Sequence, residues 1–499
     1  MSAPLRTAER IVFRDDPVPQ AEPALEVAFI GHCPGPARWQ ALRDDPQRAT
    51  IMRAAGCGAD LDRLIRLAPR DDSPDTAALR ALYRMPVPVH SLGEFEALFP
   101  QASRRPLRHA SPLSGGRAWL PQAVRDFFVD DDQPPVPRRL WILRVPETEG
   151  SAAFRPDPDP RLPAERAGAW ERALRLPRLG LLALPDLERL LLPSASEWLP
   201  PAPPPAPVAD FLPCDTRATG PKPAPDETSP RPAEPPPPLA PLLAEMLGCL
   251  ARRRPDLQLL LTLPPAQRDD GPGPAPAALD ALERLRSGDA PDPLHRLQPL
   301  FPPLRRADGR LVSASGLVAG RIAVVTHRAG PWRSVAGQPL PGALAPAIAL
   351  PPATVRSLRE RPGMGVLYRR QGQLWLDDER LPAPVLAGTG SGLRSGEVAR
   401  LLGWLRRALE AAGEALVFED DSAADRLRPA LNGLLGELYR RGALRGRRPE
   451  DAWRLSRLAA PAGVILFEIE LAPAWPVDRL VVRLRREAAG GWHLEARYG

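Results

Sequence analysis

The chain has 499 residues, enough for several domains of the usual length of about 100–200 residues. Its net charge of +7 comes almost entirely from arginine, because Lys222 is the only lysine. Arginine and aspartate are interspersed, without a basic stripe interleaved with aromatic residues, which argues against a nucleic-acid partner. No stretch approaches the roughly 18 uncharged apolar residues of a membrane-spanning helix, so we expect no membrane insertion.

The cysteines and the N-terminus carry little information about chemistry. The four cysteines are far apart and form no Cys-x-x-Cys pair, so we expect neither a metal site nor a disulfide framework; they are Cys33, Cys57, Cys214 and Cys249. The opening residues contain no apolar signal core, which favours assembly in the cytoplasm without a signal peptide. Residues 1–24 are polar apart from Ile11, Val12 and Phe13, so we interpret them as an extended arm with one short strand.

The first 150 residues alternate between predicted strands and helices. Ala24–Ile30 is an apolar strand that ends at the turn residues Gly31, Pro34, Gly35 and Pro36. Ser91 followed by Glu94 has the spacing of a capping box at the start of a helix. A further helix near Ala123–Phe128 leads into an apolar strand at Arg138–Val145.

The middle of the chain is interrupted by a proline-rich segment. Pro200–Pro241 holds 17 prolines in 42 residues, which indicates an extended polyproline-type loop. The alternative is a ligand for a proline-binding module. A helix at Leu242–Arg253 and a strand at Leu257–Leu263 follow.

Small and aromatic residues punctuate the next segment. Gly316 and Gly320 fall on one predicted helix, where they allow another element to approach closely. Trp332 is a large apolar anchor. The run around Gln371-Gly372 predicts a β-hairpin with its turn at these two residues.

The last hundred residues show the clearest pattern. A helix from about Glu397 has an apolar stripe, at Val398, Leu401, Leu402, Leu405, Ala408 and Leu409. Its other face carries polar residues, at Arg400, Arg406, Arg407 and Glu410. A second leucine-striped helix ends at Gly442, where a left-handed C-terminal residue is expected. Two predicted strands follow, Val464–Leu471 and Leu480–Leu484.

No group of residues predicts a reaction. His32 and Cys33 are adjacent, so on a strand their side chains point to opposite sides and cannot form a nucleophile pair. Asp130–Asp132 and Glu419–Asp421 lack the spacing of a calcium loop. Gly388–Gly392 lacks the Lys-Ser/Thr of a phosphate-binding loop. We therefore expect no catalytic, cofactor or metal residues and a protein that is not an enzyme.

The order of these elements resembles the contractile tail sheath family of phage tails and contractile injection systems. The similarity is most specific at 397–484, including the Gly-Ala-Leu-x-Gly turn at Gly442–Gly446 and the Ala-Pro-x-x-Pro link at Ala472–Pro476. Ser91-x-x-Glu94-Phe95 and Gly316-x-Val318-Ala319-Gly320 match further family passages. The Pro-Gly-Val-Tyr-like strand that usually opens the family is missing.

The resemblance implies an α+β (mixed α/β), multidomain fold with a C-terminal domain of helices packed on a β-sheet. The implied units are an N-terminal arm (1–24), an N-terminal α/β part (25–150), an outer or middle domain (151–300), a core segment with a hairpin (301–390) and a C-terminal domain with its arm (391–499). It also implies a structural subunit that forms stacked hexameric rings around an inner tube and contracts, with baseplate and tail-terminator proteins as further partners.

In this family, strands at the chain ends are shared between neighbouring subunits. The resemblance therefore implies two exchange segments, Ile11, Val12 and Phe13 in the arm and Leu480, Val481, Val482, Arg483 and Leu484 with the following tail (491–499). The polar face of the 397–411 helix becomes a candidate contact to the inner tube. Its alternative is an ordinary solvated helix face. Two other functions stay open: a non-polymerising baseplate or cap component of the same apparatus, and an enzyme with an unrecognised site.

Overall fold

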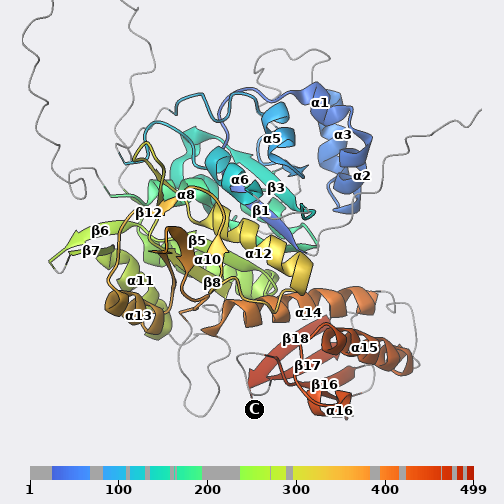
Figure 1. Ribbon diagram of the computed structural model, residues 1–499. Coiled ribbons are helices and arrows are strands. Elements are labelled where there is room, and N and C mark those ends of the chain that lie inside the picture. The colour runs from blue at the N-terminus through green and yellow to red at the C-terminus, as the bar shows by residue number, and fades with distance from the viewer. Residues whose placement is uncertain are drawn as a thin grey trace, which may run out of the picture.

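The computed structural model describes most of the chain, with gaps (Figure 1). The described residues are 25–67, 82–107, 113–129, 135–157, 162, 166–193, 236–269, 271–287, 296–382, 394–414, 423–461, 464–474, 480–486 and 492–498. The predicted strand at Ile11, Val12 and Phe13 lies outside them, as do 200–235 of the proline-rich segment and the runs 130–132, 388–392 and 419–421.

A nine-stranded sheet organises the first part of the chain, which we call the body. Its order is β11-β14-β13-β8-β5-β4-β1-β3-β2. The strands are β1 (Glu26–His32), β2 (Pro86–Val89), β3 (Arg139–Val145), β4 (Leu179–Ala183), β5 (Gln258–Thr262), β8 (Leu297–Phe301), β11 (Pro339–Leu340), β13 (Gly365–Arg370) and β14 (Gln373–Leu376). The six strands from β13 to β3 are parallel, and antiparallel strands close both edges.

Helices cover the body sheet, so its central strands are buried along their length, as expected for parallel strands. They are α1 (Trp39–Arg43), α2 (Pro46–Ala54), α3 (Gly58–Leu67), α5 (Leu92–Leu98), α6 (Leu120–Phe128), η1 (Glu147–Phe154), α7 (Ala169–Leu174), α8 (Pro185–Leu190), α10 (Leu239–Arg253), α11 (Pro276–Ser287), α12 (Ser315–Ala329) and α13 (Pro352–Glu360). No helix within the described ranges is both long and apolar enough to cross a membrane.

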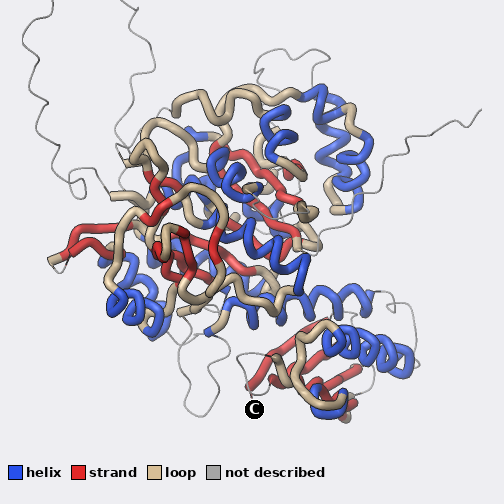
Figure 2. The backbone as a smooth tube through the Cα atoms, in the orientation of Figure 1, coloured by secondary structure: helices blue, strands red, loops and turns tan. Residues whose placement is uncertain are grey.

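Two smaller sheets accompany the body sheet. A two-stranded hairpin, β6 (Pro265–Arg268) with β7 (Gly271–Pro274), projects from it in Figure 2. A three-stranded sheet has the order β10-β9-β12, from β9 (Leu304–Arg305), β10 (Leu311–Val312) and β12 (Ala345–Pro346).

The predicted borders near 150 and 300 are not borders of the body sheet. β1, β5 and β13 come from three of the predicted units, yet they belong to one continuous sheet. The division was wrong at these points because sequence order does not reveal that strands from distant segments are inserted side by side. The body extends from β1 to β14.

The C-terminal domain begins with a long helix and has its own sheet. Its elements are α14 (Gly396–Glu414), α15 (Ala423–Arg440), α16 (Pro449–Ala452), β15 (Trp453–Leu458), β16 (Ile465–Leu471), β17 (Leu480–Arg486) and β18 (Trp492–Tyr498). The sheet is antiparallel, in the order β15-β16-β17-β18. In Figure 1 this sheet lies apart from the body, with α14 between the two. The predicted α+β, multidomain class is confirmed.

Several local predictions are confirmed by the backbone. The Ser91 hydroxyl accepts a hydrogen bond from the Glu94 amide at 3.1 Å, which caps α5. Gln371 and Gly372 both have positive φ in the turn between β13 and β14, as a tight hairpin turn requires. Gly442, two residues after the end of α15, has a φ of 74°. β15 and β18 were not predicted as strands, although Trp492, Leu494, Ala496 and Tyr498 alternate with polar residues along β18.

Close packing of α12 on α6 depends on two glycines. A Cβ atom on Gly316 would lie 2.6 Å from the carbonyl oxygen of Ala123, and one on Gly320 would lie 2.4 Å from that of Phe127. These distances involve backbone atoms, which cannot rotate away. The predicted role of both glycines in close approach is therefore confirmed.

We predict that Gly320→Ala lowers the free energy of unfolding by about 2–3 kcal/mol, because α12 must move off α6 to make room for the new methyl group. Chemical denaturation measures the change. Gly433→Ala is the matched control: it lies within a helix, α15, and a Cβ there meets nothing within 4 Å. That variant should be neutral or gain up to about 1 kcal/mol. Equal losses in both variants would contradict the packing argument.

Candidate assembly surface in the C-terminal domain

The C-terminal sheet has one apolar face and one polar face. Ile465, Phe467, Ile469 and Leu471 on β16 are buried, and the residues between them are half-buried. On the polar face, Arg483 of β17 lies directly opposite Glu468 of β16, with Nε 2.8 Å from a carboxylate oxygen. Because successive side chains of a strand point to opposite faces, the apolar residues share one face of the sheet, which can pack on helices.

The apolar face packs against α14 and α15 and forms a core separate from that of the body. Its buried members include the predicted stripe of α14 and the leucines of α15, namely Val398, Leu401, Leu402, Leu405, Leu409, Leu427, Leu431, Leu435 and Leu438. Trp332, which follows α12 in the body, also belongs to this core and is 7% exposed. The predicted apolar anchor therefore joins the body to the C-terminal domain.

The position of β17 corrects the predicted exchange strand. Residues Leu480, Val481, Val482, Arg483 and Leu484 lie on β17, which pairs with β16 on one side and with β18 on the other. Both edges of β17 are thus occupied by its own chain, so this strand could pair with a neighbouring subunit only after β16 or β18 has left the sheet. Within the C-terminal sheet, the strands with one unpaired edge among those that the structure describes are β15 and β18. β18 lies in the tail that the resemblance also implicated.

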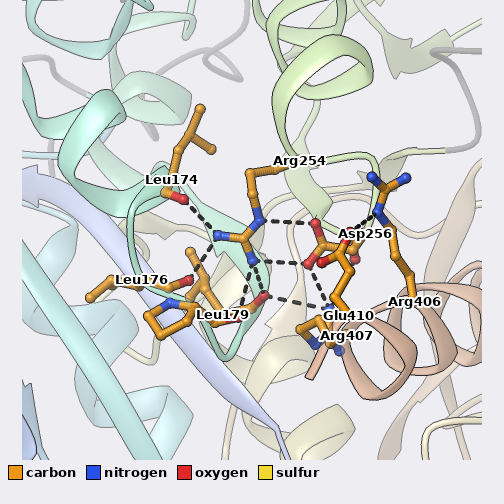
Figure 3. A network of polar contacts seen from close by, with 9 residues as sticks. Leu174, Leu176, Leu179, Arg254, Asp256, Arg406, Arg407 and Glu410 are labelled. Atoms are coloured by element: carbon orange, nitrogen blue, oxygen red, sulfur yellow. Dashed lines mark hydrogen bonds and ion pairs between the residues drawn. The ribbon is translucent and has the colours of Figure 1, made fainter. Parts of the chain in front are cut away.

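The polar face of α14 is fastened to the body through Asp256 (Figure 3). Arg254 donates to both oxygens of the Asp256 carboxylate at 2.9 Å. Nη1 of Arg407, on α14, lies 3.1 Å from Oδ2 of Asp256 and also donates to the Asp256 carbonyl oxygen at 3.2 Å. The Asp256 side chain is 2% exposed, so this is a buried carboxylate between two guanidinium groups.

Arg254 extends the same network into the end of α7 and the start of β4. It donates to the carbonyl oxygens of Leu174, Leu176 and Leu179 at 2.6, 2.8 and 3.1 Å. Burial raises the pKa of Asp256, but hydrogen bonds and charge from Arg254 and then Arg407 outweigh it, so the pKa is lowered overall. The carboxylate is therefore charged at neutral pH and holds α14 against the body.

A second buried ion pair lies nearer the start of α14. Nη2 of Arg400 donates to Oε2 of Glu379 at 2.7 Å and to the Arg333 carbonyl oxygen at 3.3 Å. The side chains of Arg400 and Glu379 are 2% and 0% exposed. The expectation that Arg400 lies on an exposed face, available to an inner tube, is wrong, because its guanidinium is enclosed between α14 and the body.

Of the four predicted contact residues, Arg406 and Glu410 remain partly exposed. They form an ion pair one helical turn apart, at 2.7 Å, with side chains 17% and 39% exposed. Arg407 is committed to Asp256. A contact of α14 with another protein stays a prediction for Arg406 and Glu410 alone.

Glu397 adds a second buried acid to this interface. Burial, and after it the charge of Glu379, raises the pKa of Glu397 to about 7. Its Oε2 atom is buried without a hydrogen-bond partner, and so is Oε1 of Glu379. Two carboxyl groups therefore face one guanidinium, that of Arg400, at the base of α14.

We did not predict the attachment of α14, because its partners come from distant segments. One signal was present: Gly403 lies on the polar face between Arg400 and Arg407. A Cβ on Gly403 would lie 2.3 Å from the Asp256 carbonyl oxygen. A glycine on the polar side of a helix indicates close contact with another backbone.

The adjacent residues His32 and Cys33, considered above as a possible nucleophile pair, have a structural role. The His32 amide donates to Oδ2 of Asp186 at 2.8 Å, and the Trp119 and Leu120 amides donate to the same carboxylate at 3.0 Å. Asp186 thus joins the end of β1 to the start of α6. Burial raises the pKa of the Cys33 thiol to about 12, so this thiol is protonated at neutral pH. Within the described ranges, no three His, Cys, Asp or Glu side chains gather as metal ligands would.

Comparison with known proteins gives structural matches alone. No protein-family model matches the chain, and no curated protein is detectably similar to it. A chain of the anti-feeding prophage baseplate in the contracted state is similar at a TM-score of 0.53 and 17% identity, covering 96% of this chain and 95% of that one. A chain of the six-fold symmetrised anti-feeding prophage baseplate has a TM-score of 0.51 and 16% sequence identity, and the match covers 95% of this chain and 97% of that one.

A chain of the contracted PVC sheath complex, from an extracellular contractile injection system, gives a TM-score of 0.49 at 12% identity and covers 95% of this chain and 96% of that one. The two baseplate matches span nearly the whole of both chains and show a shared fold. The chain therefore has the fold of contractile-particle proteins that the sequence resemblance predicted, in a divergent sequence.

We predict that Asp256→Asn lowers the free energy of unfolding at pH 7 by about 3–5 kcal/mol, because two guanidinium groups lose their shared buried charge. The loss should shrink below about pH 4, because the lowered pKa gives stability that is present above the unfolded pKa and lost as the carboxylate is protonated. Denaturation at both pH values measures this. The double variant Arg406→Gln/Glu410→Gln, on the same helix, should cost under about 1 kcal/mol. A comparable loss there would contradict a special role of Asp256.

We predict that Glu397→Gln removes part of the pH dependence of stability. The folded pKa of about 7 exceeds the value of about 4.3 for an unfolded glutamate, so its contribution is complete below pH 4 and is lost as the pH rises through 7. Relative to the unmodified chain, the variant should therefore gain stability from pH 5 to pH 8, by about 1.4 kcal/mol per pKa unit. Glu410→Gln is the control on the same helix. Parallel pH profiles for all three proteins would contradict the assignment.

Proposed function

We propose that this protein is a structural subunit of a contractile injection system, which joins copies of itself through the edge strands of the C-terminal sheet. The subunits would stack as hexameric rings around an inner tube and shorten by moving between two packings of the same parts. The protein performs no catalysis in this proposal. It would assemble in the cytoplasm and become part of a phage tail or a released tail-like particle.

The single observation that carries the proposal is the pair of open edges on the C-terminal sheet. The outer edge of β18 has no partner strand within the described segments. β15 presents the other open edge. An edge strand has unpaired backbone groups that another strand can bind, and main-chain hydrogen bonds supply the affinity.

β18 also suits exchange because it pairs with one strand only, β17. Its removal would expose one edge of β17, while β15, β16 and β17 stay joined in register. A neighbour's strand can then take the vacated position. In this form of the proposal β17 receives the strand and β18 is the donor, with Ile11, Val12 and Phe13 as the candidate second donor.

The joint at α14 gives the shared sheet a fixed relation to the body. Asp256 and Glu379 hold the helix from the body side, and the leucine stripe holds the sheet from the other. Displacement of a shared sheet would therefore carry the body with it. Contacts to an inner tube, proposed for Arg406 and Glu410, would lie on this same helix.

A second function is favoured by the comparisons: a baseplate component that does not polymerise. The two structures with the higher TM-scores are of the anti-feeding prophage baseplate. Such a protein would share the fold and bind baseplate, tube or tail-terminator partners. It would form discrete rings or remain a monomer where a sheath subunit forms long tubes.

We predict that a chain ending at Gly491 folds but forms no tubes, because it lacks the donor strand β18. The full chain, produced with an inner tube protein, should give tubes in electron micrographs. Sedimentation then distinguishes polymers from folded monomers, and circular dichroism checks the fold.

The matched control is Arg483→Gln/Glu468→Gln, which changes the same sheet but leaves every backbone edge intact. It should polymerise like the full chain. Normal tubes from the shortened chain would refute strand donation by β18. Discrete rings from the full chain at high concentration would favour the baseplate function.

A further inference from the structure

Two adjoining cavities lie over α6, far from the C-terminal sheet in the sequence. One holds about 360 Å³ and is lined by Ser103, Arg104, Ser114, Arg117, Trp119 and Gln122 among others. The second holds about 380 Å³ and lies next to Val129 and Leu344. Arg125, Arg306 and Asp308 line both, so the two cavities are parts of one depression, which we call the α6 groove.

The first half of the groove has an excess of positive charge. Five arginines line it, Arg104, Arg117, Arg125, Arg306 and Arg310. Three of them are paired with carboxylates: Arg306 with Asp126 at 2.8 Å, Arg125 with Glu96 at 3.1 Å and Arg310 with Asp308 at 3.7 Å. Five guanidinium groups against three carboxylates leave two positive charges.

The surplus charges are those of Arg104 and Arg117. Both side chains are exposed at the rim, and neither has an ion-pair partner in the part of the chain that the structure describes. They come from separate segments, after α5 and before α6. Two guanidinium groups from different segments, facing one cavity, can both bind an incoming anion.

The walls of this half are held in place by the backbone. The Leu107 amide donates to the Gly116 carbonyl oxygen at 2.7 Å, and the Leu311 amide donates to that of Leu113 at 3.0 Å. Gly115, at a φ of 66°, lies under the Arg310 guanidinium, where a Cβ would be 3.2 Å from Nε. The basic half is thus a formed surface whose shape does not depend on a ligand.

The second half of the groove is mostly apolar. Val129, Leu317, Pro341, Ala343 and Leu344 line it beyond the shared arginines. An inorganic anion would use only the basic half. The carboxylate of Asp308 lies where the two halves meet, so a ligand that is negatively charged along its whole length fits less well than one that is charged at one end only. The arginines of the groove that are already paired all bind carboxylates.

We propose that the α6 groove binds an extended acidic peptide segment of another protein, with carboxylates between Arg104 and Arg117 and an apolar side chain near Leu344. This inference does not rest on the strand exchange proposed above. Its partner is defined by chemistry: two or more adjacent Asp or Glu residues followed, within a few residues, by a Val, Leu or Ile. Arginine forks recognise carboxylates, and the apolar half adds burial of a side chain.

The test uses the full chain and a fluorescently labelled peptide, Glu-Glu-Glu-Glu-Gly-Leu-Val, followed by anisotropy. Arg104→Gln/Arg117→Gln should weaken binding about tenfold, which equals the loss of one charge-assisted hydrogen bond. Arg53→Gln/Arg66→Gln removes two exposed arginines from α2 and α3 and is the matched control. It should change the affinity less than twofold, roughly, because these residues lie outside the groove.

Two further arms test the apolar half and the class of ligand. Ala343→Asp should weaken the Leu-Val peptide more than a peptide ending in Gly-Gly. Pyrophosphate should displace the peptide only weakly. Equal weakening by the control pair would overturn the proposal, since binding would then follow net charge alone. Strong displacement by pyrophosphate, with no preference for Leu-Val, would also overturn it and indicate a small-anion site.

Discussion

A single buried carboxylate, that of Asp256, is the constraint on which the relation between the two parts of the molecule depends. It receives hydrogen bonds from Arg254 in the body and from Arg407 on α14. Desolvating one carboxylate and two guanidinium groups is costly, so the arrangement is favourable only while all three remain together. This makes the contact specific: an altered position of α14 would leave buried charge without compensation.

Helix α14 therefore has two different kinds of interface. Its leucine stripe supplies one wall of the apolar core of the C-terminal domain, where the hydrophobic contacts are not directional. Its polar face makes directional ion pairs to Asp256 and Glu379 and admits the body backbone at Gly403. In the proposed contraction, copies of the chain would then move relative to one another where their edge strands meet, while α14 keeps its position on the body.

The sequence allowed prediction of what depends on neighbours in the chain. The stripe of α14, the cap at Ser91 and the turn at Gln371-Gly372 each follow from local periodicity or from one residue's conformational preference. The candidate site was harder. Arg400 resembles any solvated residue until Glu379 is placed beside it, and β17 is interior only because β18 folds back on it. Both facts depend on contacts that sequence order does not encode.

The dual role of α14 also fixes where the molecule can be divided. Judged by its strands, the C-terminal domain starts after α14, but its core includes Val398, Leu401, Leu405 and Leu409 of that helix. A fragment cut behind this helix would lose one wall of that core and expose leucines on α15 to water. A self-sufficient fragment must begin at Gly396 or earlier. Without the body, the Arg400 and Arg407 side chains would then be exposed to solvent, where a guanidinium group is well hydrated.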